Sequence, residues 1–201
     1  FAQSLIRSYA YTGKWIIENN HFYGSSVETD PMPDVNMIWV FGGQCIIRNN
    51  YFGGKAPYCG GGACTMPNQP AGLISAILIH SHDQQLKDTV IITGNKISNI
   101  EVNWPAIHPP DIEFAGIYST QHSAIIADNE IGEFVDNTPS IKFKGTRAFG
   151  VISLSTGNVQ VKNNHIKGME VFAGHFFGIE VNGENSVTAT TNYVIQDNSI
   201  S

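Results

Sequence analysis

The sequence has few charged residues, few cysteines and no long apolar run. Only 14% of its 201 residues are charged, and its formal net charge is −6, so no basic patch for nucleic acid is expected. The longest uncharged apolar run, near residues 73–79, is much shorter than the ~20 residues of a membrane-spanning helix. We therefore expect no nucleic-acid partner and no membrane span.

Neither end of the sequence carries a recognisable targeting or capping segment. No signal peptide is visible, and the chain starts with Phe1 instead of an initiator methionine. At the other end, Ser201 directly follows an apolar strand pattern, although the ends of a repeat protein need polar caps. We therefore expect the sequence to be part of a longer protein, or to be capped by a partner.

A repeated segment occurs six times along the chain. Each copy has an aliphatic pair, two mostly polar residues, an asparagine and, two places on, an apolar residue. The asparagines are separated by 30, 45, 34, 35 and 34 residues, and they are Asn20, Asn50, Asn95, Asn129, Asn164 and Asn198. Such self-similarity is typical of stacked supersecondary units and not of one closed core.

The repeated segment has the pattern of a β-strand. The residues five and three places before each asparagine are nearly all apolar and often β-branched, a period of two that predicts a strand with one buried face. These pairs are Trp15/Ile17, Cys45/Ile47, Val90/Ile92, Ala124/Ile126, Val159/Val161 and Tyr193/Ile195. The residue directly before the asparagine is always Asn, Gly or Asp, so a sharp left-handed or bridge-region corner is expected there.

A second motif precedes the first in most repeats and reads as a short strand entered through a glycine. Its copies are AGLIS (71–75), AGIYS (115–119), FGVIS (149–153) and FGIEV (177–181). The succession of strand, asparagine corner, strand and long loop resembles the right-handed parallel β-helix of the pectate-lyase-like superfamily, over residues 1–201. The resemblance implies an all-β solenoid of about six turns in a single domain, with long loops on one side.

That superfamily is functionally broad, and the fold alone does not dictate chemistry. It includes polysaccharide lyases, glycosidases, epimerases, phage tailspikes and inert shafts, and its polysaccharide groove lies along the flank of the glycine-containing strands. The resemblance therefore implies a module at the virion surface or outside the cell that engages a polysaccharide or surface glycan. No cofactor is expected, since Ca²⁺ would fit the family but no clear calcium motif is present.

Candidate chemistry should form rows across the repeats, because side chains on neighbouring coils of a β-helix stack ~4.8 Å apart. Aligned on Gly72, Gly116, Gly150 and Gly178, the position three before holds Gln69, Glu113, Arg147 and His175. The position two after holds Ile74, Tyr118, Ile152 and Glu180, with Trp39 at the equivalent place one repeat earlier. Just beyond these strands follow His80, His82, Asp83, His122 and Glu184.

One reaction that these residue types would support is polysaccharide elimination. A lyase needs a base to remove the proton beside a uronate carboxylate, and a cation to stabilise the charge that develops. Arg147 would be the cation, and Tyr118 would be a proton donor. The base would be His175 or His122.

A glycoside hydrolase is the other enzyme that the sequence would support. It needs two carboxylates flanking the scissile bond, which Glu113 together with Glu180 or Asp111 would supply. Flat aromatic side chains would stack on the apolar faces of sugar rings. The predicted substrate-binding residues are Trp39, Tyr118, His82 and His122.

The same residues also fit a surface without catalysis. Glu113 beside Arg147 is an ordinary cross-strand ion pair, which contributes ~0–1 kcal/mol when exposed. The paired aspartates with Gly-His-Gly of the polygalacturonase-like glycosidases are missing, and so is the clustered-aspartate calcium site of pectate lyases. Catalysis is therefore left open, and a structural shaft or receptor-binding segment, tailspike-like or adhesin-like, is the alternative function.

The three cysteines fall into two kinds. Cys45 takes the place of an inward apolar residue of the repeat, so we expect a buried free thiol. Cys59 and Cys64 bracket Gly-Gly-Gly-Ala in a loop flexible enough to close a small disulfide, whereas a metal site would need further ligands. A disulfide would favour an extracellular or virion setting.

One row of the repeat is aliphatic where an outward side chain is expected. The residue four before each corner asparagine is Ile16, Ile46, Ile91, Ile125, Gln160 or Val194, between mostly polar neighbours. An exposed apolar stripe usually marks an interface. We therefore expect a homo-oligomer, with the trimer of the tailspikes that the chain resembles as the favoured form. Coverage of the stripe by the chain's own loops is the alternative.

Overall fold

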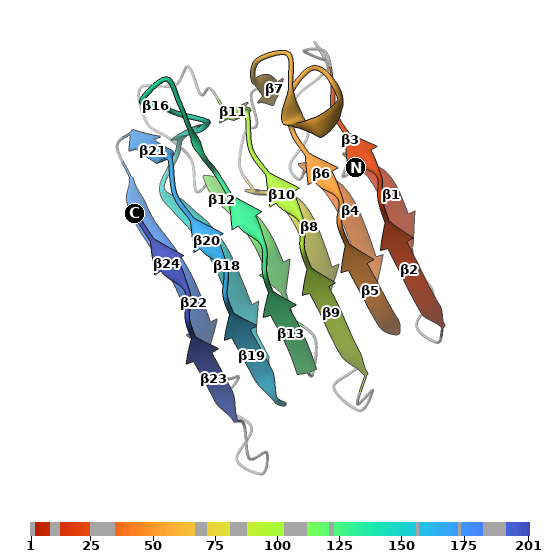
Figure 1. The fold of residues 1–201 in the computed structure, drawn as a ribbon. Helices are drawn as coiled ribbons and strands as arrows, with labels where there is room; N and C mark the ends of the chain where they lie inside the picture. Colours follow the sequence, from red (N-terminus) through yellow and green to blue (C-terminus); the bar gives the residue numbers. More distant parts are fainter. Residues whose placement is uncertain are drawn as a thin grey trace.

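The computed structural model describes residues 3–8, 13–24, 35–66, 72–80, 88–102, 112–120, 123–155, 157–172, 174–182 and 192–201. Most of these residues lie in β-strands, and none of them belongs to a helix with the length and hydropathy that crossing a bilayer requires. The strands form four parallel sheets and one short hairpin, arranged as successive coils of the chain (Figure 1). The all-β parallel β-helix expected from the repeats is therefore confirmed.

Each sheet takes one strand from each successive coil, so its neighbours are distant in sequence. Sheet 1 contains β1 (Gln3–Ser8), β4 (Val35–Phe41), β8 (Gly72–His80), β12 (Ile112–Ser119), β18 (Arg147–Leu154) and β22 (His175–Asn182). Sheet 2 contains β2 (Lys14–Glu18), β5 (Gln44–Arg48), β9 (Thr89–Thr93), β13 (Ser123–Ala127), β19 (Val159–Lys162) and β23 (Tyr193–Gln196). These strands place the described residues in six coils.

The other two sheets have shorter strands. Sheet 3 contains β3 (His21–Phe22), β6 (Tyr51–Phe52), β10 (Lys96–Ile97), β14 (Glu130–Ile131), β20 (His165–Ile166) and β24 (Ser199–Ile200). Sheet 4 contains β7 (Cys64–Met66), β11 (Ile100–Val102), β17 (Ile141–Lys144) and β21 (Met169–Phe172). A 3₁₀ turn, η1 (Pro57–Cys59), and the antiparallel hairpin of β15 (Phe134–Val135) and β16 (Thr138–Pro139) stand outside the four sheets.

The core is a column of apolar side chains that runs through the middle of the coils. The inward residues that the period of two predicts in the middle coils, such as Ile47, Ile92 and Ile126, are fully buried. In the last coil the equivalent side chain Ile195 is 55% exposed, because no described strand lies beyond β23. The inward side chains of the first coil are nevertheless buried, with Ile17 at 6% and Phe22 at 8% exposure, so the two ends of the core differ.

The asparagine corner between sheets 2 and 3 has the backbone geometry that the sequence predicts. The residues directly before the asparagines all have positive φ angles, between 53° and 65°, and they are Asn19, Asn49, Gly94, Asp128, Asn163 and Asp197. The asparagine amides stack in one ladder: Asn95 Nδ2 donates to Asn129 Oδ1 at 3.0 Å, and Asn129 Nδ2 donates to Asn164 Oδ1 at 2.9 Å. The corner is thus a backbone turn locked by side-chain hydrogen bonds.

The glycine alignment of the second motif is wrong in one repeat. Gly72 starts β8 and pairs with Ile112, whereas Gly116 lies in the middle of β12, opposite Ala76 between the pairs Ala115–Ser75 and Ile117–Ile77. In the last three coils glycine is needed at the mid-strand site for space: a Cβ on Gly150, for example, would lie 2.6 Å from the carbonyl oxygen of Gly178. The motif glycine therefore marks a close approach inside the coil and not the entry of a strand.

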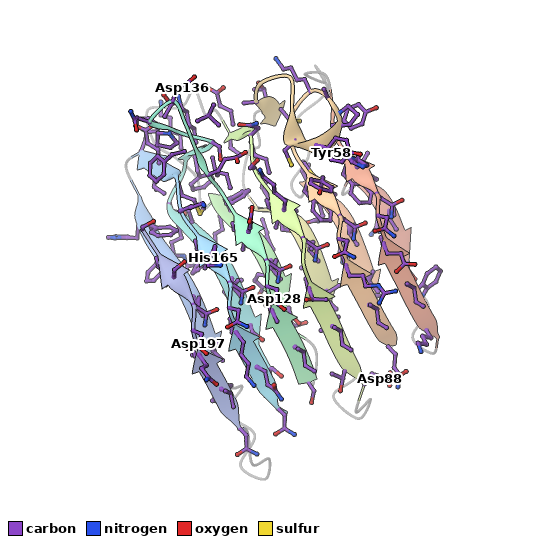
Figure 2. The ribbon with its side chains drawn as sticks, viewed as in Figure 1. Tyr58, Asp88, Asp128, Asp136, His165 and Asp197 are labelled. Carbon is purple, nitrogen blue, oxygen red and sulfur yellow. The ribbon has the colours of Figure 1, made fainter. Side chains whose placement is uncertain are left out.

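Two insertions enlarge the connection between sheets 3 and 4. In the second coil residues 53–63 carry η1, and in the fourth coil residues 132–140 carry the β15–β16 hairpin. In the third coil the same connection has two residues, Ser98 and Asn99. Figure 2 shows Tyr58 and Asp136 on the two insertions, at the same end of the view. The insertion 53–63 lies in the repeat with the longest spacing, 45 residues, whereas the hairpin is an addition that the repeat spacing does not predict.

Candidate functional site

The predicted charged row on the outer face of sheet 1 exists. Glu113 pairs in register with Arg147, and Arg147 pairs with His175, so the three residues stand on consecutive coils. The guanidinium of Arg147 forms an ion pair with the carboxylate of Glu113, and the two side chains are 53% and 22% exposed. Gln69 lies outside the described residues, and the register places Leu73 opposite Glu113 in its stead.

A second row lies further along the same strands. As predicted, this row contains Trp39, Tyr118 and Glu180. Strand pairing connects them coil by coil, in the order Trp39, Leu78, Tyr118, Ile152 and Glu180. Ile74 does not belong to this row, because the four-residue error at Gly72 shifts it into the core, where it is fully buried.

The register keeps the two rows apart. Glu113 precedes Tyr118 by five residues on one strand, and Glu180 is two coils beyond Tyr118. At ~3.3 Å per residue and ~4.8 Å per coil, the Cα atoms of Glu113 and Glu180 lie roughly 19 Å apart. Hydrolase carboxyl groups stand about 5–9.5 Å apart, so the structure does not bring this pair together. Tyr118 is separated from Arg147 by a similar distance along the strands.

Several predicted residues lie outside the described part of the chain: Asp111, His82, Asp83, His122 and Glu184. His80, at the end of β8, is described: its Nδ1 lies 3.3 Å from Thr120 Oγ1, and its ring meets the edge of Phe41 with centroids 5.8 Å apart. Among the described residues, no three His, Cys, Asp or Glu side chains gather in a possible metal site.

Aromatic side chains that the predicted site did not include flank the charged row. The rings of Phe149 and Phe177 stack with centroids 5.2 Å apart, and the guanidinium carbon of Arg147 lies 5.9 Å from the Phe149 centroid. Both phenylalanines directly precede a motif glycine, a recurrence already visible in FGVIS and FGIEV. At the other end of the sheet, the guanidinium carbon of Arg7 lies 4.2 Å from the ring centroid of Trp39.

The aliphatic row on sheet 2 has the register and exposure that the sequence predicts. Strand pairing aligns its six members one above another, coil by coil. Ile16 is 53% exposed and Val194 is 38% exposed, while Ile46, Ile91 and Ile125 are half-buried. The stripe is therefore an apolar row on an outer face.

The three cysteines are free thiols, so the disulfide expected between Cys59 and Cys64 is not formed. The Cys59 sulfur lies 3.4 Å from the carbonyl oxygen of Phe52, and the Cys64 sulfur lies against Gly24. The two thiols contact different parts of the chain, and loop flexibility alone did not decide their direction. Cys45 is buried as expected, and burial raises the pKa of its thiol to about 12.

A polar cluster joins the third coil to the fourth. Lys96 Nζ lies 2.7 Å from Glu133 Oε2, and the fully buried Ser98 donates from its hydroxyl to Glu133 Oε1 at 2.8 Å. Burial alone would raise the pKa of the Glu133 carboxyl, but the hydrogen bonds from Lys96 and Ser98 and the lysine charge outweigh it and lower the pKa. Burial likewise opposes the charge of Lys96, yet its contacts with Glu133 raise its pKa overall.

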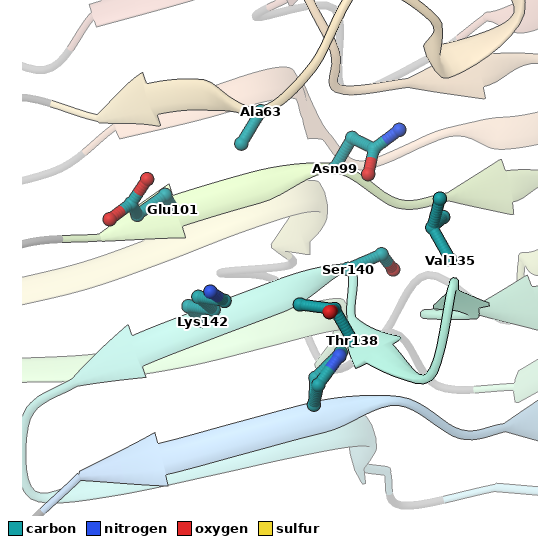
Figure 3. A pocket seen from close by; sticks show the side chains of 8 residues that line it. Ala63, Asn99, Glu101, Val135, Thr138, Ser140 and Lys142 are labelled. Carbon is teal, nitrogen blue, oxygen red and sulfur yellow. The ribbon is translucent and has the colours of Figure 1, made fainter.

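A hollow of about 230 Å³ opens beside this cluster, on the outer face of sheet 4. Its lining includes Asn99 and Glu101 from one coil, Ser140 and Lys142 from the next, and Val135 of the hairpin (Figure 3). Sequence analysis did not find this hollow, because none of its residues belongs to the repeated motifs.

Comparison of the chain with protein-family models, curated proteins and solved structures gives no significant match. The function of these surfaces must therefore be argued from their own chemistry.

Proposed function

We propose that the chain is a β-helix module of the pectate-lyase-like kind that binds an acidic polysaccharide through the outer face of sheet 1, outside the cell or on a virion. The observation that carries this proposal is the half-exposed guanidinium of Arg147, set in register between Glu113 and His175. A guanidinium presents paired N–H donors that match a carboxylate, the group that every uronate residue carries.

The apolar neighbours of the row support a sugar as the bound unit. Phe177, stacked on Phe149, is 40% exposed and lies in the row next to His175. An aromatic face packs against the apolar face of a pyranose. One sugar residue could then contact Phe177 with its ring while its carboxylate meets Arg147.

Binding is better supported than cleavage. The hydrolase pair of Glu113 and Glu180 is too far apart, and the Arg147 guanidinium already holds the Glu113 carboxylate. Elimination would use Arg147 as the cation and the neighbouring His175 as the base, which would take the proton beside the uronate carboxylate. The electron pair would form the double bond of the unsaturated product and expel the glycosidic oxygen, which would take a proton from water.

A matched pair of arginine variants tests the binding surface. Arg48 forms an ion pair with Glu18 on sheet 2, where the two residues are also cross-strand neighbours and are 49% and 37% exposed. We expect Arg147→Gln to weaken binding of polygalacturonate or alginate about tenfold or more in calorimetry. Arg48→Gln should leave the affinity unchanged.

Equal losses in both variants would indicate a general charge effect and contradict a site on sheet 1. Tighter binding of a neutral glucan than of polygalacturonate would also contradict it. The ultraviolet absorbance of unsaturated uronate, recorded in the same samples, reports whether elimination occurs. If the wild type forms unsaturated uronate and His175→Gln does not, the surface on sheet 1 is catalytic as well as a binding site.

A second function, an oligomeric shaft, is favoured by the aliphatic stripe on sheet 2. Its aliphatic side chains run without interruption over the first four coils, Gln160 occupies the fifth, and Val194 ends the row in the sixth. We expect sedimentation of the purified chain to show an oligomer at micromolar concentration, and Ile91→Lys, in the middle of the stripe, to dissociate it. Thr89→Lys, two residues earlier on the same strand, is the control. A monomeric wild type contradicts the shaft.

A further inference from the structure

The corner between sheets 4 and 1 carries a second cation and a second aromatic ring beside the surface proposed on sheet 1. The chain passes this corner between Lys144, the last residue of β17, and Arg147, the first of β18. One coil later it passes the corner again between Phe172, the last residue of β21, and His175, the first of β22. Lys144 and Phe172 therefore lie on the sheet 4 side, and Arg147 and His175 lie on the sheet 1 side.

Lys144 and Phe172 are neighbours on the outer face of sheet 4. On β17 the fully buried Ile141 and Phe143 alternate with Lys142 and Lys144, so the two lysines point outward. Phe172 is directly opposite Lys144 and is 46% exposed. Over the described ranges of the chain, the exposed ammonium of Lys144 has no ion-pair partner. The two side chains thus present a charge and an apolar ring together to solvent.

The backbone of the corner is fixed. The backbone amide of His175 donates to the carbonyl oxygen of Thr146 at 3.0 Å. Gly174 lets the two passes of the chain approach closely, because a Cβ at this position would clash with the carbonyl oxygens of Gly145 and Thr146. Strand pairing continues on both sides of the corner, from β17 to β21 and from β18 to β22. The corner is therefore ordered before a ligand binds, which lowers the cost of binding.

The two cations are close enough to be contacted by one oligosaccharide. Lys144 and Arg147 are three residues apart, so their Cα atoms are separated by no more than ~11 Å. A polyuronate carries a carboxylate on every sugar residue, and it therefore offers an acceptor to each cation in turn. The lysine ammonium is a compact charge with rotatable donors, so it tolerates several carboxylate orientations.

We propose that this corner is a second uronate subsite. A polyuronate that meets Arg147 with one carboxylate continues across the corner, where a further residue places its carboxylate at Lys144 and its ring on Phe172. This inference rests on the proposed binding of an acidic polysaccharide by sheet 1. It makes the preferred ligand an oligomer, because two contacts made by one molecule give a higher affinity than either contact alone.

The neighbouring charges limit the subsite on the side away from sheet 1. Glu101, Lys142 and Glu170 form the next outward row of sheet 4, two residues before Lys144 and Phe172 on their strands. This row contains two acids and one base, so it gives a polyanion no further attraction. The uronate chain is therefore expected to leave the surface after Lys144.

Oligomers of increasing length test the subsite. The probes are galacturonate and its linear oligomers, titrated into the ¹⁵N-labelled full chain and followed by amide chemical shifts. Galacturonate should shift amides around Arg147 and His175. The longer oligomers should also shift amides of Lys144 and Phe172, and they should bind at least about fivefold more tightly than galacturonate.

Matched variants separate this subsite from general surface charge. Lys144→Gln and Phe172→Ala should each weaken binding of the longer oligomers about fivefold and leave binding of galacturonate unchanged. Arg147→Gln should weaken binding of both. Lys162→Gln removes the same charge from the outer face of sheet 2 and should bind every probe as wild type does. Circular dichroism of all four variants confirms that each is folded.

Two results would overturn the subsite alone. One is that the longer oligomers bind no more tightly than galacturonate, and the other is an equal loss of affinity in Lys144→Gln and Lys162→Gln. In both cases a loss of galacturonate binding in Arg147→Gln would still support the surface on sheet 1. If the wild type binds neither galacturonate nor its oligomers, the surface on sheet 1 is contradicted and the subsite with it.

Discussion

Lys96 Nζ and Glu133 Oε2 lie 2.7 Å apart although the residues are 37 positions apart in the chain. The pair joins β10 of the third coil to the connection that carries the hairpin in the fourth. Each side chain is about a quarter exposed, so the ion pair is partly shielded from solvent. This ion pair makes the stability of the connection that carries the β15–β16 hairpin depend on pH.

The first prediction concerns acid. The pKa of Glu133 is lowered in the folded state, so its contribution to stability is present above the ordinary Glu pKa of ~4.3 and is lost as the pH falls through the folded value. The pKa of Lys96 is raised, so its contribution is lost only as the pH rises above the ordinary lysine range. Glu133→Gln should lower the free energy of unfolding by about 1 kcal/mol at neutral pH.

That difference should shrink as the pH is lowered below ~4.3, because the wild-type carboxyl is then also becoming neutral. Urea unfolding at a series of pH values measures it. Glu170→Gln, in the outer row of sheet 4, should show no comparable difference at neutral pH. A deficit in Glu133→Gln that stays constant into acid would contradict the assigned role of the charge.

The second prediction compares positions in the asparagine ladder. The buried Asn129 amide donates to Asn164 Oδ1 and to the carbonyl oxygens of Ile92 and Ala127, and its oxygen accepts from Asn95. Asn129→Ala leaves buried partners without hydrogen bonds, at ~1–3 kcal/mol for each. It should therefore lower the melting temperature far more than substitutions at the ends of the ladder.

The end variants are Asn20→Ala and Asn198→Ala. Asn20 is exposed and Asn198 is half-buried, so water can replace part of what each loses. Thermal unfolding by circular dichroism gives the comparison. Three equal shifts in melting temperature would show that the ladder does not act through burial.

The third prediction tests the close approach at the motif glycine. A Cβ on Gly150 would meet the Gly178 carbonyl oxygen at 2.6 Å and the Ile166 side chain at 2.7 Å. Because the carbonyl belongs to the backbone, Gly150→Ala should cost about 1–3 kcal/mol in the free energy of unfolding. Gly13→Ala is the control, since its nearest neighbour would be Trp15 at 3.7 Å. A loss in Gly13→Ala as large as that in Gly150→Ala would contradict the packing argument.

The fourth prediction concerns the thiols. Burial raises the pKa of all three cysteines, that of Cys45 to about 12, so few thiolates exist near neutral pH. In the native protein all three should react slowly with iodoacetamide, and in urea without reductant all three should be alkylated. Mass spectrometry counts the labels. A single label in urea would establish a disulfide between the other two cysteines.

The sequence predicted the coils well because the repeat itself contains the physical signals. Alternating apolar residues, a left-handed position and an asparagine recur in every coil, and they specify strand, corner and ladder without distant information. The register of Glu113, Arg147 and His175 followed correctly, since the motif glycine occupies the same place in those three coils. The predicted register failed at Gly72, because this glycine starts its strand and does not occupy the mid-strand position of the other motif glycines.

The hollow could not be predicted from the repeat spacing. The asparagines Asn129 and Asn164 are 35 residues apart, as in a repeat without a hairpin, because the fourth coil links β17 to β18 with only Gly145 and Thr146. The short link between β17 and β18 thus offsets the residues added by the hairpin, and the spacing of the asparagines does not change. The direction of the Cys59 thiol likewise could not be predicted from the sequence, since it depends on contacts with Phe52 and Lys96 in other strands.

The asparagine ladder also gives the solenoid an electrical direction. Every amide nitrogen donates to the side-chain oxygen of the following coil, from Asn20 to Asn50 through to Asn164 and Asn198. The amide dipoles therefore point the same way and polarise one another along the row. The two ends of the row are chemically different: at one end is the side-chain oxygen of Asn20, and at the other is the amide nitrogen of Asn198, which donates to the carbonyl oxygens of Val161 and Gln196. Coils can consequently stack head to tail along this row but cannot meet head to head without opposing the dipoles.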